Sequence, residues 1–278
     1  MLNKFYMDDI IKTALKEDIN YLDTTSDYLI PEEQVGNAYF LAKADGVLCG
    51  LDIAMRVFAL LDPAFRAEIY KNDGDAVKKG DVIVRFSGHM RELLKGERTA
   101  LNLIQHMSGI ATATAEAVLV VQGTNASIAD TRKTMPGLRP LQKYAVAVGG
   151  GKNHRFNLSD AAMLKDNHID AAGGITPAIT CLRQRLGHMV KIEVETRDLE
   201  ELGEALTAGA DIIMLDNMGL EMMKKAVKMN NGQALLEASG GITQDTLRGV
   251  AETGVDIISI GALTHSVQAF DISMKIER

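Results

Sequence analysis

The sequence predicts an α/β protein, with a barrel of the TIM type in its second half and a smaller α+β domain before it. Three observations predict this fold class. Apolar runs alternate with amphipathic helical patterns in the second half, these repeats span roughly twenty residues, and the first hundred residues show short strands with turns instead. Continuous apolar strands between helices indicate a parallel sheet, and short regular repeats favour a barrel. A doubly wound sheet fits the pattern alone as well.

The first hundred residues predict an α+β domain. The amino terminus, MLNKFYMDDIIKTALKEDI, has the pattern of an amphipathic helix with acidic residues, not that of a signal peptide. EEQVGNAYFLAKADGVLCG and AEIYKNDGDAVKKGDVIVRFSG predict short strands with turns at DG, NDGD and KKGD, and DIAMRVFALL predicts a helix between them. A long helical pattern from about Met90 to Gln122 leads into the barrel.

The second half alternates strands and helices. The predicted strands are SIADT (127–131), AAMLKD (161–166), KIEVET (191–196), IIMLDN (212–217), ALLEAS (234–239) and IISIGA (257–262). The helical patterns are PAITCLRQRLG, DLEELGEALTAGA, GLEMMKKAVKMNN and TQDTLRGVAETG. This order predicts a parallel sheet covered by helices.

Composition narrows the class of protein. The 278 residues have 46% hydrophobic and 24% charged content, which is typical of a globular protein with a full core. Cys49 and Cys181 lie far apart without CxxC spacing, which argues against a disulfide framework or zinc site and favours a cytoplasmic location. No apolar run approaches the ~20 residues of a membrane span, and the pI of about 5.4 argues against nucleic-acid binding.

One stretch is basic although the chain as a whole is acidic. The formal net charge is -7, yet no Asp or Glu occurs from Thr131 to Ser159. The basic residues in this stretch are Arg132, Lys133, Arg139, Lys143, Lys152 and Arg155, with His154 beside the last. Arg binds carboxylate and phosphate in a planar, bidentate way, and Lys supplies a point charge. The stretch therefore predicts a site for small, multiply charged anions. The run Gly149–Gly151 is not a GxGxxG fingerprint, since it follows a helix.

Polar or small residues stand at the ends of the predicted strands, where barrel active sites lie. They are Lys165, Glu195, Asp216, Ser239 and Gly261, and Arg132 and Lys133 follow SIADT in the same way. Any one of these charges alone fits a solvated strand end or a local ion pair, but the set at one end of one barrel favours function. The loops at Ser239–Gly241 and Gly261–Ala262 follow the last two strands, which is the usual phosphate site of such barrels.

Two of these residues have alternative roles. Glu195 and Asp216 could act as an acid/base pair, or they could hold ribose hydroxyls and a magnesium ion; the adjacent phosphate loops favour the second role. A lone histidine such as His154 is most often structural. Beside Arg155 it is interpreted as a neutral donor to a substrate carboxylate.

The chain closely resembles a known family along nearly its whole length. The motifs are TRKTMPGLRPLQKYAVAVGGGKNHRFNLSDAAMLKDNHI, IEVET, ADIIMLDNM, EASGGI and ETGVDIISIGALTHS, together with ADGVLCG and GERTALNLIQHMSGIAT. They are similar to those of the quinolinate phosphoribosyltransferases. The resemblance implies an amino-terminal α/β sandwich domain (1–107, possibly rejoined by 268–278) and an incomplete TIM-like α/β barrel (108–267). It also implies a homodimer or higher oligomer, up to a hexamer, with shared active sites.

The resemblance further implies a reaction and its residues. Quinolinate and phosphoribosyl pyrophosphate give nicotinate mononucleotide, pyrophosphate and CO2, with Mg²⁺, in NAD biosynthesis. The residues that match the family's quinolinate site are Arg98, reaching in from a neighbouring subunit, and Arg132, His154, Arg155 and Lys165. Those that match the ribose and pyrophosphate site are Lys133, Glu195 and Asp216, the last two also at the metal, and we expect Thr131 to bind substrate beside them. The phosphate loops are Ser239, Gly240, Gly241 and Ile260, Gly261, Ala262. Catalytic roles are expected for Lys133, Lys165, Glu195 and Asp216.

Three other functions fit the sequence less well. A nicotinate-specific transferase, or the homologue found with molybdate transport genes, needs fewer cations than His154, Arg155 and Lys165 supply. NDGDAVKKGDVIV is similar to the turn of a lipoyl or biotinyl carrier, but the Met-Lys-Met-like hairpin of that domain is absent. A catalytically dead scaffold does not fit the full set of charged residues.

Overall fold

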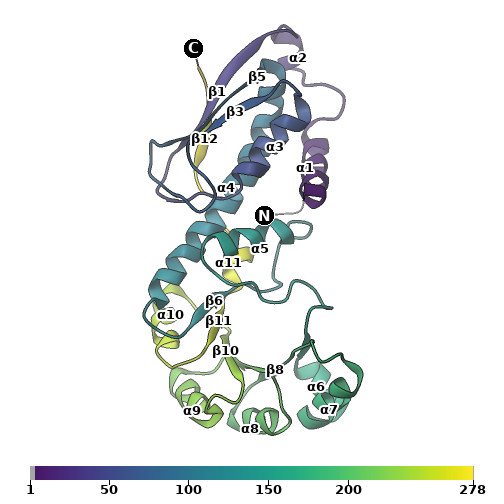
Figure 1. Cartoon of the computed structure of the whole chain (residues 1–278), viewed down its shortest axis with the longest axis vertical. Coiled ribbons are helices and arrows are strands. Elements are labelled where there is room, and N and C mark those ends of the chain that lie inside the picture. Colours follow the sequence, from purple (N-terminus) through teal and green to yellow (C-terminus); the bar gives the residue numbers. More distant parts are fainter. Residues whose placement is uncertain (1–3, 278) are drawn as a thin grey trace. The chain divides into compact units, whose positions relative to one another are not determined.

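The computed structural model describes residues 4–277, which form two compact units (Figure 1). Unit 1 consists of Met1–Ala115, Thr134–Gly150 and Leu263–Arg278, and unit 2 of Glu116–Lys133 and Gly151–Ala262. The sequence-based division differs from this grouping, since it assigns residues 134–150 to the barrel. The first three residues of the predicted amino-terminal helix lie outside the described residues.

Unit 1 contains an antiparallel sheet and most of the long helices. Its helices are α1 (Lys4–Asp18), α2 (Ser26–Leu29), α3 (Leu51–Leu61), the start of α4 (Met90–Val121), α5 (Arg139–Val148) and most of α11 (Ala262–His265). Its strands are β1 (Val35–Ala42), β2 (Gly46–Val47), β3 (Arg66–Ile69), β4 (Ala76–Val77), β5 (Val82–His89) and β12 (Ile272–Ile276). The order β12-β1-β5-β3 forms the main sheet, and β2 pairs with β4.

The core of unit 1 lies between the main sheet and α3. Alternate residues of β1 are buried, among them Ala38 and Phe40, as a half-buried strand requires. The ring of Phe40 lies 5.2 Å from that of Phe86 on β5 and 6.1 Å from that of Phe58 on α3, measured between ring centroids. These aromatic contacts fix the helix on one face of the sheet, because rings at such distances pack with offset or edge geometry.

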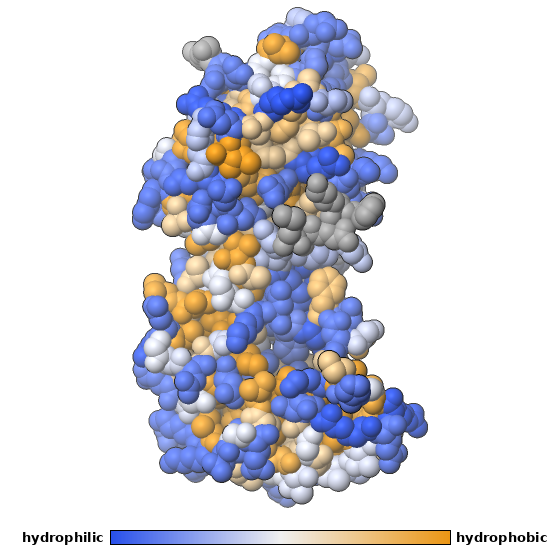
Figure 2. Space-filling view, viewed as in Figure 1, coloured by the Kyte–Doolittle hydropathy of each residue, from blue (hydrophilic) through white to orange (hydrophobic). Residues whose placement is uncertain are grey.

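The main sheet leaves large apolar side chains exposed at several places. Val35 on β1, Ile69 on β3 and Ile276 on β12 are each more than a third exposed. In the part of the surface that Figure 2 shows for unit 1, hydrophobic residues are interspersed with hydrophilic ones.

The helix α4 has the length and apolar composition to cross a membrane, although the sequence showed no uninterrupted apolar run of that size. Half of its apolar window is buried inside the protein. Leu93, Ile104 and Met107 on this helix have no exposed surface. This burial is what a core helix of a folded domain shows.

Unit 2 contains the repeating strands and helices. Its strands are β6 (Ser127–Ala129), β7 (Ala162–Leu164), β8 (Ile192–Thr196), β9 (Ile212–Asp216), β10 (Leu235–Ser239) and β11 (Ile257–Ser259). Its helices are α6 (Asp166–Ala172), α7 (Ile175–Arg185), α8 (Leu199–Thr207), α9 (Leu220–Asn230) and α10 (Gln244–Ala251), with the end of α4.

The six strands of unit 2 form one parallel sheet in the order β6-β11-β10-β9-β8-β7. Figure 1 shows the sheet curved, with α7 to α10 on its outer side. No ladder joins β6 to β7 among the described residues, so the barrel is incomplete. The predicted TIM-like, incomplete α/β barrel is therefore confirmed, and the doubly wound alternative is excluded.

The predicted helices of the barrel begin where the sequence supplies caps. Asp198 accepts hydrogen bonds from the backbone N–H groups of Glu200 and Glu201 at the start of α8, each at 2.9 Å. Thr243 begins α10 in a capping box with Thr246. Such caps satisfy backbone donors that have no partner within the helix. They also fix where each strand-to-helix loop ends, and those loops carry the site.

Candidate active site

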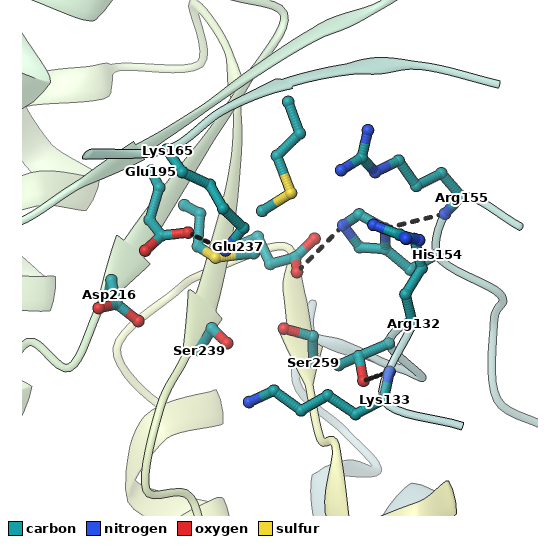
Figure 3. A pocket seen from close by; sticks show the side chains of 13 residues that line it. Arg132, Lys133, His154, Arg155, Lys165, Glu195, Asp216, Glu237, Ser239 and Ser259 are labelled. Atoms are coloured by element: carbon teal, nitrogen blue, oxygen red, sulfur yellow. Dashed lines mark hydrogen bonds and ion pairs between the residues drawn. The ribbon is translucent and has the colours of Figure 1, made fainter. Parts of the chain in front are cut away.

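The carboxyl ends of the parallel strands meet at one edge of unit 2, because all six strands run in the same direction. A cavity of about 420 Å³ opens at this edge (Figure 3). Its lining residues all belong to unit 2 and are Thr131, Arg132, Lys133, His154, Arg155, Met163, Lys165, Glu195, Met214, Asp216, Glu237, Ser239 and Ser259. The structure thus brings together the strand-end residues Lys165, Glu195, Asp216 and Ser239 with Arg132, Lys133, His154 and Arg155 of the acid-free stretch. Arg139 and Lys143 lie on α5 in unit 1, and neither they nor Lys152 and Gly261 line the cavity.

The segment with His154 and Arg155 is held beside β6. Lys152 forms a parallel bridge with Ala129, and the carboxylate of Asp130 accepts the backbone N–H of His154 at 2.8 Å. At the other end of the loop, Asp160 accepts the N–H of Phe156 at 2.6 Å. Each carboxylate that borders the acid-free stretch therefore accepts a backbone N–H within it.

Arg155 lies half-buried in the wall of the cavity. Its Nη1 donates to the carbonyl of Ala161 at 2.9 Å, and its buried Nε has no hydrogen-bond partner in the described structure. Burial lowers the pKa of Arg155, and the neighbouring Arg132 lowers it further. Two guanidinium groups held close in a partly buried wall favour an anion between them.

Lys165 and Glu195 form an ion pair across neighbouring strands β7 and β8. The Nζ of Lys165 lies 2.6 Å from the Oε2 of Glu195. The lysine side chain is 48% exposed and the glutamate side chain 18% exposed, so the lysine can turn toward a ligand while the carboxylate stays at the strand end. Figure 3 shows both side chains in the cavity.

Asp216 and Ser239 are the last residues of β9 and β10 and stand side by side in register. The loop after Ser239 continues through Gly240 and Gly241, whose φ angles of 95° and 60° lie in the left-handed region that glycine adopts without strain. The second expected phosphate loop, Ile260–Ala262, directly follows β11, the neighbour of β10. Of these loop residues only Ser239 lines the cavity.

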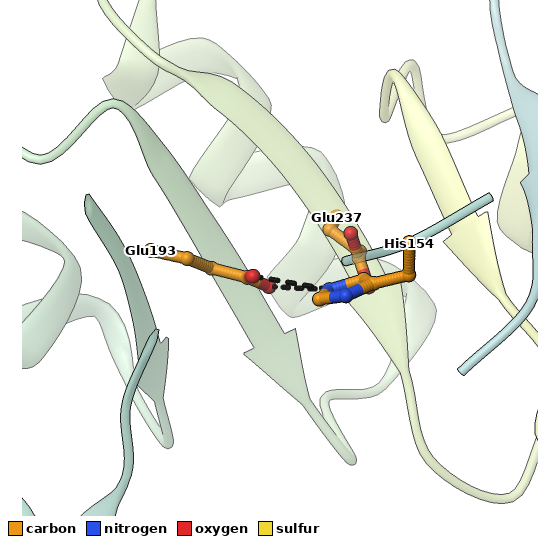
Figure 4. Close-up of side chains that lie close together, drawn as sticks. All are labelled: His154, Glu193 and Glu237. Atoms are coloured by element: carbon orange, nitrogen blue, oxygen red, sulfur yellow. Dashed lines mark hydrogen bonds and ion pairs between the residues drawn. The ribbon is translucent and has the colours of Figure 1, made fainter. Parts of the chain in front are cut away.

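Two acidic residues on the strands themselves were not predicted from the sequence to belong to the site. Glu193 on β8 and Glu237 on β10 are each only 2% exposed, and both approach His154 (Figure 4). The His154 Nε2 lies 3.0 Å from Glu193 and 3.7 Å from Glu237, while its Nδ1 accepts the N–H of Arg155 at 2.9 Å. An Nδ1 that accepts leaves the ring proton of a neutral imidazole on Nε2, facing Glu193.

This arrangement bears on the expected role of His154. The residue lines the cavity, and the neutral form fits its hydrogen bonds, but its Nε2 points at the protein's own carboxylates. Direct donation to a substrate carboxylate would require the ring to leave Glu193.

Burial raises the pKa of Glu237 to about 7, and the nearby Glu193 carboxylate adds to this effect. One proton shared in this buried group lowers the repulsion between the two acids.

The remaining predicted residues are placed as follows. Thr131 lines the cavity, and its Oγ1 accepts the N–H of Lys133 at 3.0 Å, which shapes the turn after β6. Arg98 lies on α4 in unit 1, is exposed, and does not line the cavity.

The donor chemistry at the strand ends suits magnesium. Glu195 and Asp216 offer carboxylate oxygens, the ligands that Mg²⁺ prefers together with substrate phosphates. The group of His154, Glu193 and Glu237 could also hold an ion by distance alone, since its ligand atoms lie within 4.8 Å of one another. The carboxylates of that group are buried and its third member is a nitrogen ligand, whereas Glu195 and Asp216 offer only oxygen ligands at the accessible strand ends, so the strand-end carboxylates fit magnesium better.

The fold and the cavity are those of an α/β-barrel enzyme in which basic and acidic side chains gather at the carboxyl ends of the strands. The chain matches the quinolinate phosphoribosyl transferase amino-terminal domain over residues 23–108 and the carboxy-terminal domain over residues 110–275. It therefore belongs to the quinolinate phosphoribosyl transferase family, whose members are pentosyltransferases.

Curated proteins and solved structures agree with this family. A probable nicotinate-nucleotide pyrophosphorylase (carboxylating) of Bacillus subtilis is 46% identical over 275 residues, which cover 99% of this chain and 95% of that protein. A mitochondrial quinolinate phosphoribosyltransferase (decarboxylating) 2b of Nicotiana tabacum is 44% identical over 97% of this chain and 82% of its own length. The crystal structure of NadC from Streptococcus pyogenes, 42% identical, has a TM-score of 0.96 and covers 100% of this chain and 98% of that chain.

Proposed function

We propose that the cavity of unit 2 is where this chain carries out the reaction of its family. In that reaction phosphoribosyl pyrophosphate and quinolinate give nicotinate mononucleotide, pyrophosphate and CO2, a step of NAD biosynthesis. The observation that carries the assignment is the grouping of Arg132, Lys133, Arg155 and Lys165 with two carboxylates at one edge of the barrel. A dianionic acid and a multiply charged sugar phosphate are ligands that such a site would bind.

The basic wall is assigned to quinolinate. Arg132 and Arg155 offer planar donors to its two carboxylates, and the partnerless Nε of Arg155 needs an acceptor. Lys165 is free to turn from Glu195 toward the same ligand. In this assignment His154 serves quinolinate through Arg155, whose backbone N–H it accepts.

The strand ends of β8 to β11 are assigned to phosphoribosyl pyrophosphate. Glu195 and Asp216 would face the ribose, Lys133 the pyrophosphate, and the loops Ser239–Gly241 and Ile260–Ala262 the 5′-phosphate. Backbone N–H groups of glycine loops and nearby cations favour phosphate oxygens. Glu195 and Asp216 would also hold Mg²⁺, which supplies charge neutralisation for the leaving pyrophosphate when it is bound.

The residues of the chain would act by binding and electrostatic stabilisation. The C1–O bond to pyrophosphate breaks as the ring nitrogen of quinolinate bonds to C1 of the ribose. Lys133 stabilises the charge on the leaving group, and Glu195 and Asp216 stabilise the electron-poor sugar. The 2-carboxylate then leaves as CO2, the pyridinium nitrogen stabilises the electron pair at C2, and C2 takes up a proton. No covalent enzyme nucleophile is needed.

Assembly and location complete the proposal. A homodimer, alone or as part of a hexamer, would allow Arg98 of one subunit to reach the site of another. Support comes from the exposure of Arg98 and from the apolar side chains exposed on the main sheet of unit 1. A cytoplasmic location is supported by Cys49 and Cys181, which are both free thiols.

The direct test follows CO2 release and nicotinate mononucleotide formation by the purified chain in the same assay, with and without Mg²⁺. Equal amounts of both products are expected, and each should require quinolinate and phosphoribosyl pyrophosphate together. Nicotinate mononucleotide formed without CO2, from nicotinate, would contradict the assignment and favour a nicotinate-specific transferase.

A further inference from the structure

Asn217 has an unusual backbone next to the site. Its φ is 52°, and the only other non-glycine residue with a positive φ in residues 4–277 is Asn231, at 44°. The left-handed region is unfavourable for most L-residues, whereas asparagine visits it more readily than others. Asn231 ends α9 as its C-cap, a position where this conformation is common. Asn217 caps no helix and directly follows Asp216, so its conformation calls for another explanation.

Asn217 contacts the strand ends of both β9 and β10, which the proposed function assigns to the sugar phosphate and which are called the sugar end below. Its Nδ2 donates to the Oδ2 of Asp216 at 2.8 Å. Its backbone N–H donates to the carbonyl of Ser239 at 2.9 Å. A Cβ added to Gly240 would lie 2.2 Å from the Oδ1 of Asn217, so the amide lies directly against the glycine loop.

These contacts are not part of the hydrophobic core. Asn217 is exposed, and Asp216 is half-buried at the strand end. A hydrogen bond between two solvent-accessible side chains adds little to folding stability. Strained backbone at an exposed position beside a site is a frequent sign of a functional constraint.

We propose that Asn217 is a positioning residue, which orients the carboxylate of Asp216 and the Ser239–Gly241 loop toward one phosphorylated sugar. The left-handed turn directs the amide back over the end of β9, where it can contact both. The inference rests on the proposed function, in that it takes Asp216 and this loop to bind phosphoribosyl pyrophosphate. Asn217 itself need not touch the substrate.

The test compares Asn217→Gly with Asn231→Gly. Glycine adopts the left-handed region freely, so each variant keeps the backbone turn and loses only the side chain. Calorimetric titration with phosphoribosyl pyrophosphate and Mg²⁺, without quinolinate, measures binding in the absence of turnover. We expect Asn217→Gly to weaken this binding by about tenfold, which corresponds to about 1.4 kcal/mol. Quinolinate affinity and the Tm should stay near those of the wild type, and Asn231→Gly should change neither affinity.

Further measurements distinguish failure of this inference from failure of the proposed function. Normal phosphoribosyl pyrophosphate binding by Asn217→Gly, or an equal loss of affinity for both substrates, would overturn the positioning role. An Asp216→Asn variant tests the proposed function itself. If Asp216→Asn binds the sugar phosphate poorly while Asn217→Gly binds it normally, only the present inference fails. If Asp216→Asn binds it normally, the assignment of Asp216 fails and the inference with it.

Discussion

The two ends of the cavity are built in different ways. At the basic end, Arg155 is held by His154, which in turn contacts the buried acids Glu193 and Glu237 inside the barrel. At the sugar end, Asp216 is held by its exposed neighbour Asn217 and by loops that follow the strands. One end therefore depends on buried charge, and the other on backbone turns. The difference predicts that changes at one end leave ligand binding at the other end nearly intact.

The largest expected effect is selectivity at the basic end. Nicotinate lacks the 2-carboxylate, so one of the two carboxylates that the proposal pairs with Arg132 and Arg155 would be missing, and the buried Nε of Arg155 would have no acceptor. A site built to hydrogen-bond a polar group rejects an analogue lacking it by roughly 10⁴–10⁵-fold. We expect a kcat/KM ratio of this order for quinolinate over nicotinate at saturating phosphoribosyl pyrophosphate.

Phthalate provides the matched control. It keeps both carboxylates but has no ring nitrogen to attack the ribose, so it should inhibit competitively with quinolinate. Comparable turnover of nicotinate, or no inhibition by phthalate, would remove the dicarboxylate assignment of the basic end.

The second effect is expected at the sugar end. Replacing Asp216 by Asn removes a charge that the proposal assigns to the ribose and Mg²⁺. The KM for phosphoribosyl pyrophosphate should rise by roughly 10- to 100-fold, the range of a lost hydrogen bond to a charged group. Calorimetry with quinolinate should show nearly unchanged affinity. A large loss of quinolinate affinity would show that the two ends are not independent.

The third effect concerns stability and pH at the buried acids. The pKa of Glu237 is raised to about 7 from an ordinary value of 4.5, so between these values the folded protein holds a proton that the unfolded chain has lost. The contribution of this proton to the free energy of unfolding is complete below pH 4.5. It is lost as the pH rises toward 7, by up to about 1.4 kcal/mol for each pKa unit.

Glu237→Gln removes this titration. The free energy of unfolding of the variant, relative to the wild type, should therefore increase between pH 5 and pH 8, as measured by urea denaturation. Asp245→Asn, on the exposed first turn of α10, is the control and should show no such trend. Parallel pH profiles for wild type and Glu237→Gln would argue that Glu237 stays ionised.

The smallest expected effect tests whether the basic end is shared between subunits. Arg98→Ala and Lys165→Ala should each be nearly inactive. If Arg98 reaches into a partner's site, a heterodimer of the two variants contains one intact site, and random mixing should restore about a quarter of the wild-type activity. The check is an activity assay after mixing, with subunit exchange followed independently by a tag. Exchange without recovery would argue against a shared site.

The sequence predicted which residues meet at the strand ends, because strands that all run in the same direction end at the same edge of the sheet. Six parallel strands bring Lys165, Glu195 and Asp216 to one edge whatever the details of packing. The acid-free stretch predicted only part of the basic wall, because Arg132, Lys133 and Arg155 line the cavity whereas Arg139, Lys143 and Lys152 do not. These features depend on local pattern and on strand order, both of which can be read from residues.

The buried acids could not be predicted with the same rules. Glu193 and Glu237 lie on strands that are separated by β9, and their approach to His154 depends on the curvature of the barrel. One signal was available, because each stands two residues before a predicted site residue and must point to the same side of its strand. The grouping of residues 134–150 with unit 1 also depends on long-range packing.

The pairing of β12 with β1 constrains how the chain can fold during synthesis. Ala42 lies opposite Ile272, and Ala38 opposite Ile276. One edge of β1 therefore stays unpaired until residues that follow the whole barrel in the chain have been translated. Until then β1 presents an unpaired edge, which is a template for wrong pairing. All six strands of the barrel are thus translated before β12, the strand that completes the four-stranded sheet of unit 1.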